Sequence, residues 1–252
     1  MKERLKYLDP DFYIDLITNR VHKKSKEVKW KIFDLGISLL IYLIYAYLIY
    51  FVIGIILQTS TPIVIVTSDS MEPMIYRGDI IFIQGVSADA LNSPRVDMTQ
   101  SVDQKYVREF ATLEYENDGT CSIKVSSTGG KYIDCPTLES FTIMNGVSSP
   151  TKVNITEDKE IVVYTDDVSG EDIIHRAQVK MYAPDGVYLI TKGDNKNTNP
   201  TIDQDCNFYN ILGESKLLCS LNPYPISMDK IRGKYLFKIP YLGYLKLWLF
   251  GK

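Results

Sequence analysis

An uninterrupted apolar segment constrains this chain more than any other feature of its sequence. Residues 35–57 contain no charged side chain, and Leu, Ile, Tyr, Phe and Val dominate them. A helix of about 20 apolar residues crosses the hydrocarbon core of a bilayer. A buried helix of a soluble protein would rarely stay uncharged over this length, and a cleaved signal peptide would have a shorter apolar core followed by small residues. The segment therefore predicts a transmembrane anchor, with the lipid bilayer as a partner.

Charged residues are distributed unevenly around this segment. Residues 1–31 hold nine Lys/Arg and five Asp/Glu, whereas the rest of the chain holds 19 basic and 26 acidic side chains. Basic segments beside a membrane span tend to remain in the cytoplasm. We therefore expect a single-pass membrane protein with a cytoplasmic basic arm, residues 1–34, and an extracytoplasmic remainder. The acidic outer part also argues against nucleic acid as a partner.

All four cysteines follow the apolar segment, on the side where disulfides persist. They form two local pairs in the sequence, Cys121 with Cys135 and Cys206 with Cys219. Closing a loop of about 15 residues stabilises a fold by roughly 3 kcal/mol. We predict these two disulfides; four free buried thiols are the alternative. Because no C-x-x-C motif occurs, we expect no zinc site.

The outer part has the pattern of a β-rich protein. Short segments rich in Ile, Val and Tyr are separated by Gly, Pro, Asn and Asp, which predicts strands and turns. The predicted strands are residues 62–67, 80–83, 161–164, 173–182, 187–192 and 234–239. The predicted fold class is mainly β: a transmembrane helix, residues 35–57, followed by a β domain, residues 58–86 and 157–252, with a long insertion at 87–156.

Weaker patterns describe the remaining segments. A short helix is predicted for residues 12–21, and the insertion should contain strands at 122–125 and 141–144. The apolar segment 235–250 is interrupted by Lys, Pro and Gly and is too short to span a bilayer. It either completes the core or lies in the membrane interface.

Two separate segments carry residue types that serve in nucleophilic catalysis. Ser70 follows the first predicted strand and precedes Pro73, so a turn could hold it rigid and exposed; a polar loop leaving the membrane is the structural alternative. His175 lies on the apolar face of a predicted strand, where an isolated histidine is more often a buried structural residue. The only other histidine, His22, belongs to the cytoplasmic arm. His175 is therefore the one imidazole available to the outer part.

The order of the motifs resembles a known family of proteases. After one N-terminal span come Ser68-x-Ser70-Met71-x-Pro73, Arg77-Gly78-Asp79, Ile174-His175-Arg176, Lys192-Gly193-Asp194-Asn195 and a closing block at residues 233–243. This ordered set is similar to the type I signal peptidases. It looks most like the archaeal and endoplasmic-reticulum branch, because a histidine stands where bacterial leader peptidases have a lysine.

The resemblance implies roles for individual residues. Ser70 would be the nucleophile and His175 the general base, while the backbone N–H of Ser70 and the hydroxyl of Ser68 would hold the oxyanion. Two lysines could in principle replace the histidine. We expect Lys180 to point away from His175, because neighbouring positions of a strand alternate between its faces. Lys192 adjoins a glycine turn and is expected near the substrate or solvent.

The alignment with the family leaves two candidates for the aspartate of the triad. Asp194 matches an aspartate that is functionally important in the family. Asp203 would orient the histidine if Asn199–Pro200 is aligned with the Asn-Pro of the family. Counting back from Tyr209 favours Asp205 instead, because the loop after Asp194 is longer than the family pattern. We prefer Asp203 and keep Asp205 as the alternative.

The resemblance implies a membrane-bound serine endopeptidase that needs no metal or other cofactor. It would remove signal peptides from secretory preproteins after small residues at positions −1 and −3, and the translocon or accessory subunits are further candidate partners. One alternative is a catalytically inactive, membrane-anchored subunit or scaffold that keeps the fold. Another is a self-cleaving Ser–Lys protease of the repressor class, although such a protein would be soluble and DNA-binding.

Overall fold

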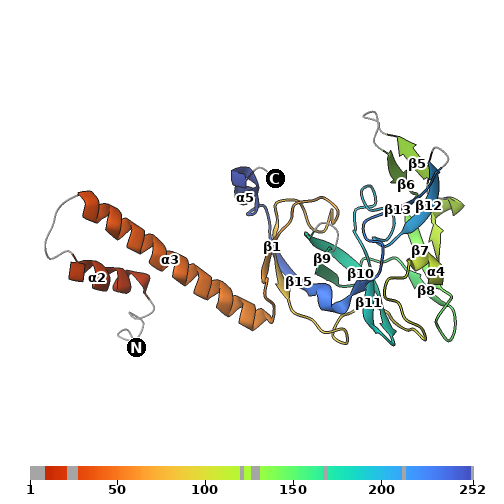
Figure 1. Ribbon diagram of the computed structural model, residues 1–252, viewed down its shortest axis with the longest axis horizontal. Helices are drawn as coiled ribbons and strands as arrows, with labels where there is room; N and C mark the ends of the chain where they lie inside the picture. Colours follow the sequence, from red (N-terminus) through yellow and green to blue (C-terminus); the bar gives the residue numbers. More distant parts are fainter. Residues whose placement is uncertain are drawn as a thin grey trace. The chain divides into compact units, whose positions relative to one another are not determined.

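The chain folds into two compact units, Met1–Ser60 and Thr61–Lys252. Figure 1 shows the computed structural model, in which the first unit is helical and the second consists mainly of strands. The structure describes residues 9–21, 28–119, 122–125, 131–166, 170–211 and 214–250.

The first unit consists of α2 (Pro10–Val21) and α3 (Val28–Leu57). The carboxylate of Asp9 accepts a hydrogen bond of 3.0 Å from the backbone N–H of Asp11, and Pro10 is the first helical residue. Both features are typical of a helix N-terminus. The helix predicted for residues 12–21 is confirmed.

Helix α3 contains the one candidate membrane span among the described residues, Ile32–Leu57, with a mean hydropathy of 2.5. The helix begins at Val28, seven residues before the predicted span, because Lys and Trp are compatible with a helix and continue it. One tyrosine of the apolar segment has a polar partner: the hydroxyl of Tyr42 donates to the carboxylate of Asp11 in α2, at 2.7 Å. The lysines at 23, 24 and 26 lie outside the described residues.

The second unit is built on an eight-stranded sheet with the order β1-β2-β15-β9-β10-β11-β14, and β3 pairs with β10 beside this path. Neighbouring strands are antiparallel except for β3 and β10, which are parallel. The strands are β1 (Ile63–Ile65), β2 (Ile80–Gln84), β3 (Arg95–Asp97), β9 (Ile161–Thr165), β10 (Asp172–Ala183), β11 (Gly186–Lys192), β14 (Ile226–Ser227) and β15 (Ile231–Ile239). The mainly β fold class is confirmed, and all six strands predicted for this part are present.

The last strand of the chain lies in the interior of this sheet. β15 pairs with β2 on one side, where Lys238 is opposite Ile81, and with β9 on the other, where Lys234 is opposite Val162. The short turn η4 (Met228–Lys230) leads into it. The first half of the apolar C-terminal segment therefore completes the sheet.

The second half of that segment is largely exposed. It forms the short helix α5 (Tyr244–Phe250), in which Leu247 is 8% exposed and Trp248 is 80% exposed. Leu247 points toward the sheet, whereas Leu245 and Leu249 remain exposed. For residues 235–250 the expectation of a place in the core therefore holds for the first half, which is a strand of the main sheet. The second half, the helix, leaves apolar side chains exposed.

The insertion forms two small sheets, a three-stranded one with the order β4-β7-β8 and the hairpin β5-β6. Its elements after β3 are α4 (Val107–Phe110), β4 (Ala111–Tyr115), η3 (Glu116–Asp118), β5 (Ser122–Val125), β6 (Lys131–Asp134), β7 (Leu138–Ile143) and β8 (Thr151–Asn154). Phe110 and Phe141 pack in one hydrophobic cluster with Val179 and Met181 of β10. The insertion therefore shares a core with the main sheet and is not a separate domain.

A second hairpin follows the main sheet strand β11. Strands β12 (Cys206–Ile211) and β13 (Glu214–Cys219) are antiparallel, and a disulfide joins Cys206 to Cys219. This predicted disulfide is confirmed. Cys135 is also disulfide-bonded, and the other half of the predicted pair, Cys121, lies outside the described residues.

Removing the Cys206–Cys219 disulfide should lower the stability of the protein and leave the packing of its core largely unchanged. The double variant Cys206→Ser/Cys219→Ser should lose about 3 kcal/mol of unfolding free energy, because the crosslink closes a short loop in the unfolded chain. Denaturant titration of the purified protein would measure this loss. Equal stability of variant and wild type, or four alkylatable thiols in the wild type, would contradict the prediction.

Candidate active site

Ser70 lies in a tight loop between β1 and β2. The loop is closed at its base, where the N–H of Gly78 donates to the carbonyl of Val66 at 2.9 Å. The side chains of Met71 and Ile75, 1% and 0% exposed, anchor it in the core. Val66, 3% exposed, anchors the loop before Ser70, and Met71 and Ile75 anchor it after, while the side chain of Ser70 remains accessible, as a nucleophile requires.

The turn after β11 supports this loop from outside. The backbone N–H of Asn195 donates to the carbonyl of Ser70, and the Asn195 side-chain amide donates to the carbonyl of Asp69, both at 2.9 Å. Gly193 permits the close approach, since a Cβ atom at this position would lie 2.7 Å from the carbonyl oxygen of Ser70. The Lys-Gly-Asp-Asn motif therefore positions the serine loop.

Gly193→Ala should impair the expected endopeptidase activity without unfolding the protein. The added methyl group must push the Ser70 backbone or the turn aside, and a misplaced reacting group of about 1 Å costs roughly 100-fold in rate. Gly36→Ala is a matched control, because a Cβ at Gly36 meets nothing within 4 Å. The measurement is kcat/KM together with the thermal unfolding midpoint. Unchanged kcat/KM in Gly193→Ala would contradict the positioning role of the turn.

His175 and Asp203 form a buried pair. His175 lies on β10, Asp203 lies between β11 and β12, and the His175 Nδ1 atom is 2.6 Å from the Asp203 Oδ2 atom. Their side chains are 3% and 0% exposed. Backbone bonds fix the aspartate, whose N–H donates to the carbonyl of Thr191 and whose carbonyl accepts from Leu221, both at 2.9 Å.

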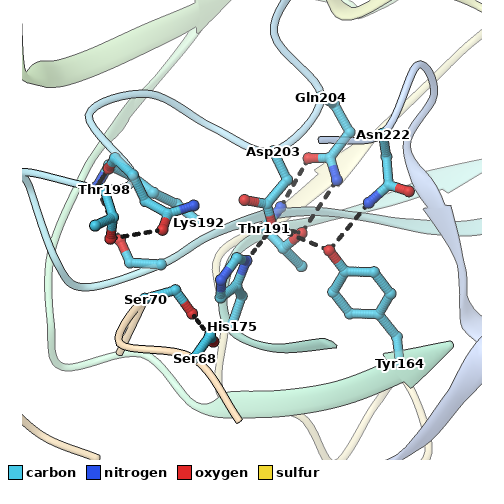
Figure 2. Close-up of polar contacts among 12 residues, drawn as sticks. Ser68, Ser70, Tyr164, His175, Thr191, Lys192, Thr198, Asp203, Gln204 and Asn222 are labelled. Atoms are coloured by element: carbon cyan, nitrogen blue, oxygen red, sulfur yellow. Dashed lines mark hydrogen bonds and ion pairs between the residues drawn. The ribbon is translucent and has the colours of Figure 1, made fainter. Parts of the chain in front are cut away.

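Side chains from three other elements surround the Asp203 carboxylate (Figure 2). The Thr191 hydroxyl donates to Asp203 Oδ2 at 2.6 Å and the Tyr164 hydroxyl donates to it at 3.1 Å. Asn222 in turn donates to the Tyr164 hydroxyl at 3.0 Å. Burial alone would raise the pKa of Asp203, but the neighbouring His175 and these hydrogen bonds outweigh it and lower the pKa below its ordinary value. Asp203 is therefore an ionised acceptor for the histidine.

Ser70 and His175 line the same cleft, which has a volume of about 360 Å³. Ser68 lines it too, and its Oγ atom is 3.2 Å from the Oγ atom of Ser70, with either group able to donate. Within the described residues no hydrogen bond joins Ser70 to His175, and the Ser70 N–H donates none either. Catalytic hydrogen bonds are often long before substrate binds. The free N–H is available to a developing oxyanion.

The structure separates the other two aspartates from the histidine. Asp194 accepts two hydrogen bonds from the guanidinium of Arg176, at 2.8 and 2.5 Å, in a pair whose side chains are 7% and 4% exposed. Arg176 follows His175 on β10, so Asp194 ties the turn after β11 to that strand. Asp194 is placed as a support for the site rather than as a partner of the imidazole.

Asp205 binds the insertion instead. Its carboxylate accepts from Arg108 at 2.8 Å, from the Tyr115 hydroxyl at 2.6 Å and from the Thr201 hydroxyl at 3.0 Å. Burial, followed by the charge of Asp205, raises the pKa of Tyr115. Of the two aspartates left open by the sequence, Asp203 is the one in contact with His175.

Neither lysine is placed to act on Ser70. Lys180 donates to the carbonyls of Ala88 and Leu91, at 2.9 and 2.8 Å. The prediction from strand alternation is wrong, because the register shift between Ala177 and Val179 returns Lys180 to the face of His175, five residues further along the strand. Of the two surroundings expected for Lys192, solvent is wrong: its side chain is 3% exposed and donates to the carbonyls of Gly193 and Asn199. Burial lowers its pKa.

Chemically, a serine beside a buried His–Asp pair can perform acyl transfer through a covalent intermediate. The described residues contain no group of three or more His, Cys, Asp or Glu side chains placed to hold a metal ion. Comparison of the chain with protein-family models and with curated proteins gives no match.

Proposed function

We propose that this chain is a membrane-anchored serine endopeptidase that removes signal peptides from exported proteins. One observation carries the proposal: Ser70 lines the same cleft as His175, whose ring is held by the buried carboxylate of Asp203. The ordered motifs of the sequence support the substrate class, and the candidate span of α3 supports the membrane anchor.

The proposed mechanism assigns one role to each group. His175 Nε2 takes the proton of Ser70 as the Oγ atom attacks the scissile carbonyl, while Asp203 keeps the Nδ1–H tautomer in place and stabilises the imidazolium. The Ser70 N–H, helped by the Ser68 hydroxyl, stabilises the oxyanion. The imidazolium then protonates the leaving amine. Water, activated by the same histidine, releases the signal peptide from Ser70.

The edge of the sheet supports an extended, apolar peptide as substrate. β1 is an edge strand, and the cleft adjoins a second groove of about 320 Å³ lined by β1 residues and Leu247. A peptide that adds to a sheet edge is bound through its backbone, and every second side chain faces the protein, which suits recognition at positions −1 and −3. Five residues separate Leu57 from β1, so a membrane-spanning α3 would tether this edge near the bilayer. Tethering raises the effective concentration of substrates that are themselves anchored there.

The proposal includes an orientation, with residues 1–31 in the cytoplasm and the β unit outside, because basic residues flank only the N-terminal end of the span. Protease added outside intact cells should digest the β unit and leave an N-terminal tag protected. Loss of the tag under these conditions would contradict the orientation.

The decisive test uses the full chain in detergent or liposomes with a preprotein substrate. The wild type should release the signal peptide after a small residue, as read by mass spectrometry of both products, and Ser70→Ala should not. Absence of cleavage in the wild type would instead favour a catalytically inactive scaffold. Equal cleavage in Ser70→Ala would exclude Ser70 as the nucleophile.

A further inference from the structure

A second cavity lies directly behind the turn that supports Ser70. It has a volume of about 490 Å³ and is bounded by the insertion, by β10 and by the turn after β11. Its floor is buried and includes Leu138, Gln178 and Lys192, whereas Glu139 and Glu157 on its rim are exposed. A volume of this size is in the range of ligand sites in proteins.

Only the Gly193 turn separates this cavity from the cleft. Gly193 lines the cavity, while its neighbour in space, Asn199, lines the cleft, and a Cβ atom on Gly193 would contact both Asn199 and the Ser70 carbonyl. The two walls are also joined by the backbone N–H of Leu138, which donates to the carbonyl of Pro200 at 2.8 Å. A chain leaving the cleft on this side meets the cavity next.

The polar groups of the cavity indicate what it can bind. Gln178 is 2% exposed; its side-chain oxygen accepts from Lys159 at 3.1 Å, and within the described residues its amide nitrogen donates no hydrogen bond. A donor that is accessible from a cavity can be paired by water or by a ligand that brings an acceptor. A peptide carbonyl is such an acceptor.

The charges of the rim favour a basic ligand. Asp194 is paired with Arg176, and Glu116 lies 3.8 Å from Lys196. In the part of the chain that the structure describes, Glu139 and Glu157 have no such ion pair, while Glu157 interacts electrostatically with Lys192 of the floor. The lining holds four carboxylates and two ammonium groups, so its acidic groups are in excess. Opposite charges at partly exposed sites attract modestly and add to specificity.

We propose that this cavity binds the first residues of the leaving polypeptide, beyond the cleaved bond, and favours basic side chains there. The inference rests on the proposed function. The groove along β1 takes the acyl side of the substrate, so the opposite direction from Ser70, past the Gly193 turn, is open to the leaving segment. The insertion supplies Glu139, and the segment directly after it supplies Glu157, so this part of the chain acts as a specificity element for the mature end of the substrate.

The test compares two preproteins that differ only in the second and third residues after the cleaved bond, Lys-Lys in one and Glu-Glu in the other. The wild type should cleave the lysine substrate with a kcat/KM about fivefold higher, which corresponds to ~1 kcal/mol. Glu139→Gln/Glu157→Gln should bring the ratio close to one. Asp103→Asn/Asp229→Asn, which removes two exposed carboxylates elsewhere, should keep it.

The outcomes separate this inference from the proposed function. Equal cleavage of both substrates by the wild type, or an unchanged preference in Glu139→Gln/Glu157→Gln, would overturn the leaving-segment site while the protease assignment stands. No cleavage of either substrate would overturn both proposals.

Discussion

His175→Ala should lower kcat/KM by about 10⁴-fold or more, because the serine then has no general base. The variant should be assayed well below its unfolding temperature, since it leaves the buried carboxylate of Asp203 without its histidine. Lys180→Met is the control: it removes a charged side chain from the same strand, one that binds the carbonyls of Ala88 and Leu91 and does not line the cleft, and should keep nearly full activity. Full activity in His175→Ala would eliminate the triad.

The pH dependence of the wild type provides a second check on this assignment. Activity should fall on acidification, because a general base must be unprotonated to accept the proton of the serine. The aspartate should not contribute to this loss, because its pKa is lowered and its stabilising contacts are lost only at still lower pH, as the carboxylate protonates. Activity that rises steadily toward low pH would contradict a neutral histidine base.

Asp203→Asn should mainly lower activity, whereas Asp205→Asn should mainly lower stability. Asp203→Asn should reduce kcat/KM by about 10⁴-fold with a small change in unfolding temperature, because an amide can hold the histidine in the wrong tautomer. Asp205→Asn should keep activity within about tenfold but lose roughly 1–2 kcal/mol of stability, since it weakens the bonds to Arg108 and Tyr115. The measurements are kcat/KM and denaturant unfolding of each variant.

The reverse pattern would relocate the third member of the triad. Loss of activity in Asp205→Asn with retention in Asp203→Asn would mean that the loop rearranges when substrate binds. Loss of both activity and stability in both variants would mean that the loop behaves as one unit, and Thr201→Val, which removes only one hydrogen bond to Asp205, would then distinguish the two roles.

The sequence predicted those parts of the fold that have a local pattern. The apolar run specified α3, and β-branched runs specified β2, β9, β10 and β11 close to their observed bounds. Strands β3, β4 and β8 were missed because they are short and polar, and they are stabilised by the core that they share with β10. Their formation depends on tertiary packing, which a local pattern cannot show.

The residues of the candidate site also fall into two groups, those that a motif predicts and those that it does not. Ser70 and His175 were found from motifs, and Asp203 from an alignment that left Asp205 open. Tyr164 and Asn222 could not be found, because they carry no motif of their own: Tyr164 reaches the Asp203 carboxylate from a distant strand, and Asn222 binds the Tyr164 hydroxyl from a loop. The solvent position allowed for Lys192 was wrong for a related reason: carbonyl partners from the turn compensate the burial of its ammonium group.

The interior position of β15 has a consequence for the biosynthesis of the protein. β15 joins β2, which follows the serine loop, to β9, which pairs with the strand of His175. A ribosome-bound chain has made Ser70 and His175 long before it makes β15, yet among the described strands β2 and β9 are joined only through β15. Under the proposed function, the nascent chain should therefore be inactive until β15 has been added to the sheet, and a chain that stops after Ser227 should cleave no preprotein. Such latency would protect the growing polypeptide, and the preproteins around it, from premature proteolysis.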